Sequence, residues 1–558
     1  MKKLHYIPAY AKLLSAALFL AVGFTSCTDI LEKQPPSSIS DGNFWTGEGD
    51  AKLALTGCYR FESGWGNDSF DHPQGILYLD LCGGHGSEKE GFTTLMAGSN
   101  TVATNSNLLN YWINAYEAIA RQNTFLDNIG NCPMDEAKKQ EWIAEVKTLR
   151  AFYFFQLAFY FNNVPMPLTS LTTEEANIIA QSSQAEVYAQ IEKDLKEAIN
   201  YLPLEQKDAN LGRLSKGAAQ ALLARLYLAQ NKYSEAATLY KSIITSNVYE
   251  LERGYGAESY EKLFQVGGEK SKETIFPIMY NNNKFTTVRY IYQYPEVVGG
   301  WHQFAINNEL VKEYFCTDGL SIEDSPLYNE NDPYMNRDLR LYASIFLPPL
   351  GSYPGTEFKG QIYNSYRTDR DYYNQHSRAN GYCPKKGADP SVNDLYSVYT
   401  YTPLIRYAEV LLSYLEAVNE SAPSSVDQTL LDQTINDIRD RVELPPYSIT
   451  DLGSQEAVRK AVRKERRVEL ALEGLRYFDV LRWGIASEEL NHTFTGVKLS
   501  DDPSAHNYRG EGSSASPVDE DMYYQYETRT WSSHNRYFPI PQNDLNINKN
   551  LKQNDGYN

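Results

Sequence analysis

The sequence is poor in the residues that build metal sites, disulfide frameworks and common catalytic centres. It holds six cysteines and eight histidines in 558 residues, and no two cysteines stand in a C-x-x-C spacing. The motifs H-E-x-x-H, G-x-S-x-G and G-x-x-x-x-G-K-[ST] are missing as well. These absences argue against a zinc protease, an α/β-type serine hydrolase and a P-loop enzyme, and no cofactor is expected.

Positive charge is also scarce. Lysine and arginine number 52 against 71 aspartates and glutamates, so the formal net charge is −19. Such a surface repels phosphate backbones, and nucleic acid is not an expected partner. The acidic stretch YNENDPY at 328–334 has oxygen groups that suit calcium, but it lacks the twelve-residue loop pattern. A structural calcium ion is therefore not indicated by motif, and a solvated turn is the better interpretation.

Long hydrophobic runs are scarce too, and the one at the N-terminus is short. Residues 13–24 are apolar-rich, whereas a helix that spans a bilayer needs about 20 residues. Three lysines precede this run and FTSC follows it at 24–27, which is the order of a signal peptide. We expect residues 1–26 to be removed and Cys27 to be the lipidated first residue of a bacterial lipoprotein, with a net charge of −22. A soluble secreted protein is the alternative.

The first half of the remaining chain has helical periodicity. A polar tether at 27–49 leads into a helical scaffold at 50–249. Helices are predicted at 107–129 and 135–161. A pair at 214–246 resembles a tetratricopeptide repeat, because small alanines alternate with large apolar residues around a short turn.

The C-terminal part, residues 401–558, continues the same domain with helices at 402–420, 426–441 and 455–473 and a closing segment. The expected fold class is mainly α, a tetratricopeptide-like scaffold of helix pairs that carries long irregular loops and a few short strands.

Tyrosine is the residue in excess, and it gathers in one region. Residues 250–400 hold 18 of the 43 tyrosines, where even spreading would give about 12, and they are rich in Gly, Pro, Asn and Asp. Turn residues between short aromatic runs such as RYIYQYPEV predict loops with small strands. We expect this insertion to face a ligand. Residues 76–106 and 492–535 are predicted as further loop segments.

Several separated motifs together resemble one family. They are CTDILEKQP, SDGNFWTGEGDAKLALTGCY, EVKTLRAFYFFQLAFYFNNVP, GRLSKGAAQALLARLYL, IRYAEVLLSYLEAVN, RKERRVELALEGLRYFDVLRWG and YFPIPQNDLNINKNLKQNDGYN. In this order they resemble the SusD/RagB family of Bacteroidetes outer-membrane lipoproteins. The resemblance runs from end to end, although region 250–400 does not match in detail.

The resemblance implies a lipoprotein on the outside of the outer membrane that binds a nutrient, usually a glycan. It also implies a partner, a SusC-like TonB-dependent transporter, and no catalysis. Two alternatives stay open. Glycoside hydrolysis needs only two carboxylates, which 71 acidic residues can supply, and a tyrosine-rich surface can also take an extended peptide.

A sugar site needs flat aromatic faces together with amide, guanidinium or carboxylate groups. Tryptophans flanked by glycine in loops have less reason to be core, which singles out Trp65 and Trp301. Weaker candidates lie beside them or ahead of the helix at 107–129: His85, Phe92, Tyr292, Tyr294 and His302.

The run at 463–484 is the most basic in the chain. We interpret it as an internal, ion-paired structural helix. Glu465 falls on its apolar helical face, where a carboxylate must be paired. Four pairs at helical spacing are expected to neutralise much of the charge: Glu456–Lys460, Arg466–Glu469, Glu473–Arg476 and Asp479–Arg482. Gly474 is predicted to end or kink the helix.

Overall fold

A computed structural model describes residues 44–59, 70–88, 106–281, 285–350, 353, 357–366, 369–373 and 379–557. Three residues singled out above, Cys27, Trp65 and Phe92, lie outside the described residues.

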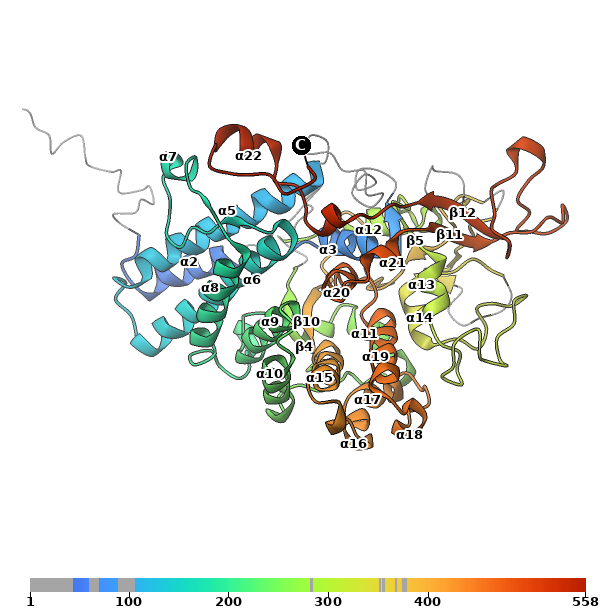
Figure 1. The fold of residues 1–558 in the computed structure, drawn as a ribbon, viewed down its shortest axis with the longest axis horizontal. Helices are drawn as coiled ribbons and strands as arrows, with labels where there is room; N and C mark the ends of the chain where they lie inside the picture. The colour runs from blue at the N-terminus through green and yellow to red at the C-terminus, as the bar shows by residue number, and fades with distance from the viewer. Residues whose placement is uncertain are drawn as a thin grey trace, which may run out of the picture.

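Two long helices and their neighbours form one end of the molecule (Figure 1). Helix α5 (Ser106–Ile129) packs against α6 (Glu136–Phe161), as predicted. Asp135 caps α6 by accepting a hydrogen bond from the Lys138 amide at 2.9 Å. Helix α8 (Gln184–Ala198), which we did not predict, covers the other side of α6 and starts in a capping box of Ser183 and Glu186.

The repeat-like pair is confirmed. Helix α9 (Lys216–Ala229) and α10 (Tyr233–Thr245) flank a short turn and pack together, and α10 packs against α15 (Tyr407–Ser421). The predicted start of α15 at 402 is wrong, because residues Thr402–Arg406 form strand β10. A strand is favoured there because β4 (Thr274–Ile278) supplies a partner edge.

The C-terminal helices are more broken than predicted. The segment 426–441 forms α16 (Gln428–Asp432) and α17 (Ile435–Arg441). They are separated where Thr434 leaves helical geometry and its hydroxyl donates back to the Leu430 carbonyl. Helix α19 (Gln455–Glu469) ends before Gly474, which has a φ of +80°. Helix α20 (Arg476–Arg482) then begins, so the predicted break is confirmed.

Region 250–400 consists of short elements, as expected. RYIYQ within the aromatic run forms a helix, α12 (Arg289–Gln293), where we expected loop or strand. The stretch 76–106 also begins in a helix, α3 (Pro73–Asp80), which Pro73 starts at its first position. The other helices of the described residues are α2 (Glu48–Cys58), α7 (Thr173–Ala176), α11 (Ser259–Leu263), α13 (Asn308–Glu313), α14 (Leu339–Ser344), α18 (Ile449–Leu452), α21 (Ala486–Leu490) and α22 (Gln542–Ile547).

Every sheet among the described residues has two antiparallel strands. The pairs besides β4–β10 are β1 (Gly86–Glu88) with β5 (Phe304–Ile306), β2 (Val164–Pro165) with β3 (Gln181–Ser182), β6 (Ile345–Phe346) with β9 (Cys383–Pro384), β7 (Glu357–Phe358) with β8 (Gln361–Ile362), and β11 (Thr493–Lys498) with β12 (Tyr523–Thr528). Helices thus carry the core, and the fold class is confirmed. No helix in the described ranges is both long and apolar enough to cross a membrane.

Glu465 is buried and paired, as predicted. Its carboxylate lies 2.6 Å from Arg340 and 3.2 Å from Arg439. It belongs to a charge cluster that holds five acids and five bases, all at most 8% exposed at the side chain. Its members are Glu273, Asp338, Arg340, Lys386, Arg406, Arg439, Arg441, Glu465, Glu469 and Glu473.

Only one of the four predicted helical pairs is confirmed, Asp479 with Arg482 at 2.8 Å. Glu469 binds Arg340, Arg406 and Arg441 instead of Arg466. The other two predicted pairs are wrong as well: Glu456 binds Arg459, Glu473 binds Lys386 and Arg406, and Arg476 binds Glu489. Glu465, Glu469 and Glu473 are paired with basic groups from distant segments, because neighbours on one helix cannot surround a buried acid.

Candidate ligand-binding site at α12

Tyr292 and Trp301 form an aromatic pair at the surface. Tyr292 projects from α12 and is half-buried, and Trp301 lies in the following turn with 40% of its surface exposed. The two ring centroids are 5.2 Å apart and the planes cross at 83°. An edge-to-face pair of this kind holds both rings in place while part of the tryptophan stays open to solvent.

The glycines before Trp301 allow the chain to fold back onto α12. Gly299 has a φ of +92°, and a Cβ on Gly300 would stand 2.1 Å from the Tyr294 carbonyl oxygen. After this turn the Trp301 amide donates to the Ile291 carbonyl at 2.6 Å. The Gln303 amide donates to the Tyr292 carbonyl at 2.9 Å. The turn is therefore fixed by main-chain bonds to the helix that carries Tyr292.

His302 is turned inward and anchors this turn. Its Nδ1 lies 3.0 Å from Asp371 Oδ1, and both residues are buried. The same carboxylate accepts hydrogen bonds from the amides of Glu296 and Val297. Asp371 thus joins both ends of the turn, a contact that sequence reasoning missed because the two segments are 69 residues apart.

Tyr294 and His85 also lie inside the protein. Tyr294 is fully buried and stacks on Tyr290 with centroids 4.4 Å apart. His85 is 1% exposed, and burial lowers its pKa to about 4, so the ring is neutral at pH 7. Of the candidate residues that the structure describes, only Tyr292 and Trp301 present side-chain surface to solvent.

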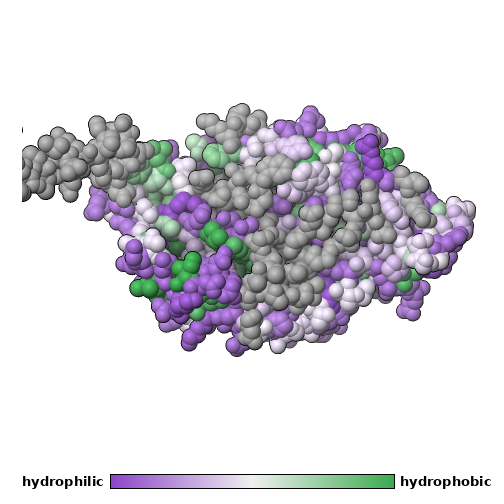
Figure 2. All heavy atoms as spheres, turned by 90° about the horizontal axis from the view of Figure 1, so that it is seen from above, coloured by the Kyte–Doolittle hydropathy of each residue, from purple (hydrophilic) through white to green (hydrophobic). Residues whose placement is uncertain are grey.

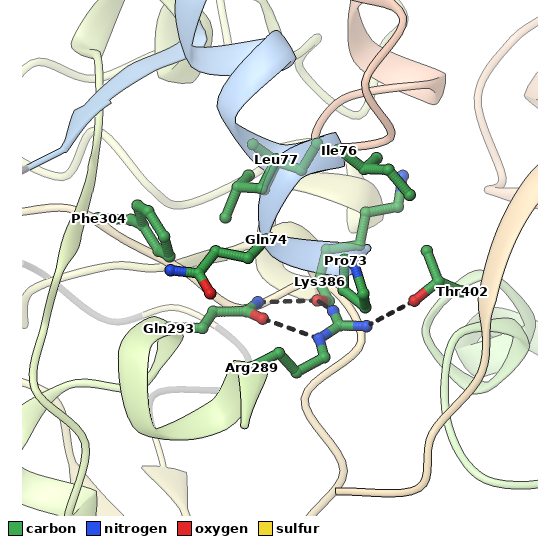
Figure 3. Close-up of a pocket in the computed structure, with 10 residues that line it drawn as sticks. Pro73, Gln74, Ile76, Leu77, Arg289, Gln293, Phe304, Lys386 and Thr402 are labelled. Carbon is green, nitrogen blue, oxygen red and sulfur yellow. Dashed lines mark hydrogen bonds between the residues drawn. The ribbon is translucent and has the colours of Figure 1, made fainter. Parts of the chain in front are cut away.

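A polar network on the side of α12 that faces α3 holds this helix in place (Figure 3). Arg289 Nε donates to Gln293 Oε1 at 3.2 Å, and both side chains donate to the Lys386 carbonyl, at 3.0 and 2.9 Å. They line a cavity of about 30 Å³ beside Pro73 and Gln74 at the start of α3. The spacing of Arg289 and Gln293 by four residues is the signal by which a helix could have been predicted here.

The β1–β5 sheet links this site to the chain around residue 88. Gln303 Nε2 donates to Glu88 Oε1 at 2.7 Å, and Glu88 pairs with Phe304 in the sheet. The Gln303 amide lies two residues after Trp301 in the sequence and is held by the buried Glu88 carboxylate. Flat aromatic surface beside a half-buried amide is the chemistry that binds the C–H faces and hydroxyls of a sugar ring.

Within the described ranges, no group of three His, Cys, Asp or Glu side chains is placed to hold a metal ion. The five cysteines there are free and buried: Cys58, Cys82, Cys132, Cys316 and Cys383.

The model of the SusD family matches residues 261–557, which is more than half of the chain. The chain belongs to the SusD family. A second model, described as starch-binding and associating with the outer membrane, matches residues 82–228. The resemblance noted from the motifs is thereby confirmed.

Members of the SusD family also match over nearly their full length. SusD-like protein P2 of Formosa agariphila is 26% identical over 84% of this chain and 90% of its own. The starch-binding protein SusD of Bacteroides thetaiotaomicron is 23% identical over 98% and 99%. A crystal structure of a SusD-like carbohydrate-binding protein from Bacteroides fragilis shares the fold with a TM-score of 0.82 and 30% identity, over 91% of this chain and 100% of that one.

Proposed function

We propose that this protein captures a glycan at the cell surface and delivers it, uncleaved, to a SusC-like TonB-dependent transporter in the outer membrane. The observation that carries the proposal is the exposed Trp301, held edge-to-face against Tyr292 on a helix that hydrogen bonds from Arg289 and Gln293 hold in place. Rigid aromatic surface binds sugar faces with little loss of conformational entropy. The starch-binding and carbohydrate-binding relatives support the same ligand class.

Electrophoresis through gels that contain single polysaccharides tests this proposal. The chain from residue 27 with Cys27→Ala should be retarded by at least one polysaccharide, and it should release no new reducing ends from it. Release of reducing ends would favour the glycoside hydrolase instead. Retention by a peptide library with no retardation in any polysaccharide gel would favour a peptide ligand.

Anchoring is tested by the same substitution in cells. Lipidated Cys27 should place the protein in the outer-membrane fraction, and Cys27→Ala should release it, because the acyl chains provide the attachment. The transporter should co-purify with the tagged wild-type protein as a large outer-membrane barrel. Cys27→Ala protein that stays on washed cells would contradict the lipid anchor.

A further inference from the structure

A second concave surface lies away from α12, between α5, the segment 165–179 and the C-terminal segment with α22. We call it the α5–α22 groove. It encloses about 430 Å³ and is lined by residues such as Trp112, Ile113, Tyr116 and Ile547. Seen from above, apolar residues gather at the end of the molecule where these helices lie, among hydrophilic ones (Figure 2). A groove of this size and lining is typical of a binding site.

The groove is preformed, because amide and hydroxyl groups join its walls. The Tyr116 hydroxyl donates to the Pro165 carbonyl at 2.8 Å, and Asn123 Nδ2 donates to the carbonyls of Pro167 and Thr169. On the other side, Asn548 Nδ2 donates to the Ile179 carbonyl at 2.8 Å. The three walls therefore cannot close over the space without breaking these bonds.

Apolar side chains that line the groove, and the neighbouring Ile178, are exposed to solvent. The exposed fractions are 40% for Ile113, 37% for Leu171, 65% for Ile178 and 63% for Ile547. Exposed apolar residues that surround a groove mark a surface that is covered by a macromolecule, since a small ligand would leave the rim in water.

The charge of the groove restricts what can cover it. Among the 18 described residues that line it, two are acidic, Glu117 and Asp544, and none is lysine or arginine. Neither acid has an ion-pair partner within the described part of the chain. Asp544 accepts a hydrogen bond from Trp112 Nε1 at 3.2 Å, and burial raises its pKa. A cation beside it would relieve that cost of burial.

We propose that the α5–α22 groove binds a segment of a partner protein in which an apolar side chain is flanked by lysine or arginine. The apolar residue fills the space between Tyr116 and Ile547, and the basic residue reaches Asp544 or Glu117. A second copy of this chain is a poor occupant because its own net charge is −19. This inference goes beyond glycan capture and uses none of the residues of the α12 site.

A defined peptide tests the chemistry in solution. The probe is a fluorescein-labelled peptide KKLLFLLKK, and its counterpart carries glutamate in place of lysine. Fluorescence anisotropy should show saturable binding of the basic peptide, weakened about tenfold or more in the double variant Ile113→Lys with Ile547→Lys. The matched control is Leu204→Lys with Leu327→Lys, which adds the same charge at leucines 57% and 42% exposed elsewhere.

The comparison of the two double variants decides the peptide result. Near-wild-type binding in the control with loss in the groove variant supports the proposal. Equal weakening in both would show attraction to the net charge alone and would overturn it, as would equal binding of the glutamate peptide. Polysaccharide retardation should be unchanged in both, so that failure of the groove and failure of glycan binding remain distinguishable.

Photo-cross-linking in cells tests the occupant itself. A photoreactive phenylalanine at Ile547 should cross-link to another polypeptide, and the same residue at Leu204 should not. Mass spectrometry of the cross-linked peptide should show an apolar residue beside lysine or arginine. A cross-link to a second copy or to the protein's own N-terminal segment, or no cross-link beyond that at Leu204, would overturn the proposal.

Discussion

The charge cluster and the α12 site differ in both the charge and the burial of their side chains. The cluster brings ten charged side chains into the interior, where each is paired and at most 8% exposed at the side chain. The α12 site presents two uncharged aromatic rings, one of them 40% exposed. The run at 463–484 supplies three acids of this cluster, Glu465, Glu469 and Glu473, and the five bases come from other segments. We expect the run to serve stability, because buried charges need partners from several segments. The surface available for binding is aromatic.

The sharpest test of this contrast is Glu465→Ala. It leaves Arg340 and Arg439 with fewer partners in the interior. Breaking a buried pair costs about 3 to 5 kcal/mol, so the melting temperature should fall strongly. Polysaccharide retardation, measured well below that temperature, should be unchanged.

The matched control is Glu456→Ala on the same helix, where the side chain is 58% exposed and binds Arg459. An exposed pair contributes about 0 to 1 kcal/mol. The fall in melting temperature of Arg467→Ala should lie between those of these two variants, since the Arg467 side chain is 12% exposed and binds Glu313 and Glu489. If folded Glu465→Ala were no longer retarded by the polysaccharide, the charge cluster would contribute to binding as well as to stability, and the contrast would be wrong.

Trp301→Ala should have the converse effect. Removal of an exposed aromatic contact should weaken polysaccharide binding about tenfold or more, which is about 1.4 kcal/mol. The melting temperature should change little, because the side chain is only partly buried. Affinity gels at several polysaccharide concentrations give the ratio. Tyr255→Ala, at a tyrosine 59% exposed elsewhere, is the control and should bind as the wild type does.

Gly300→Ala tests whether the turn places Trp301. The added Cβ would meet the Tyr294 carbonyl oxygen, so the turn must shift away from α12. We expect binding to weaken several-fold, less than in Trp301→Ala, because the ring is displaced but present. Gly130→Ala, where a Cβ meets nothing within 4 Å, should leave binding unchanged. If Gly300→Ala bound the polysaccharide as tightly as the wild type does, the conformation of this turn would not be needed for recognition.

Acid should affect stability through the buried pairs. Arg441, Arg406 and Arg340 hold the pKa of Glu469 well below 4.5, and Arg466 and Arg482 lower that of Asp479. An acid whose pKa is lowered on folding adds stability above its ordinary pKa, and that stability is lost progressively as the pH falls from the ordinary pKa through the lowered one. The melting temperature should therefore fall as the pH decreases from 5 to 3.

Asp479→Asn should lower the melting temperature at pH 7 and make its fall in acid shallower, because one such carboxylate is gone. Asp451→Asn is the control, since this carboxylate is exposed to solvent. A melting temperature that rises in acid would contradict the pairing.

The sequence predicted those helices that depend only on the pattern of apolar residues within the segment itself. Helices α5, α6, α9 and α10 follow from apolar residues repeated over three or more turns. Helix α12 was not predicted as a helix because five residues carry too little periodicity. The partners of Glu469 could not be predicted either, because Arg340 and Arg406 lie 129 and 63 residues away.

The same limit applies to the candidate site. The glycines indicated that Trp301 sits in a turn, and a backbone contact at Gly300 explains why. Tyr292 and Tyr294 share one aromatic run, yet one reaches the surface and the other is fully buried. Only the packing of α12 against β6 and β7 residues decides between them. Their contact with a ligand stays a prediction.

The charge cluster also predicts an order of events during folding. Glu273 and Glu473 are 200 residues apart in the sequence, yet both bind Arg406. The helices up to α10 can form from contacts close in the chain, whereas the cluster closes only when residues 465–473 have arrived. Until then Lys386 lacks its carboxylate partner, and Arg340 and Arg406 have only Asp338 and Glu273. We therefore expect the loops that carry Trp301 to be fixed late in folding, after residues 465–473 have packed.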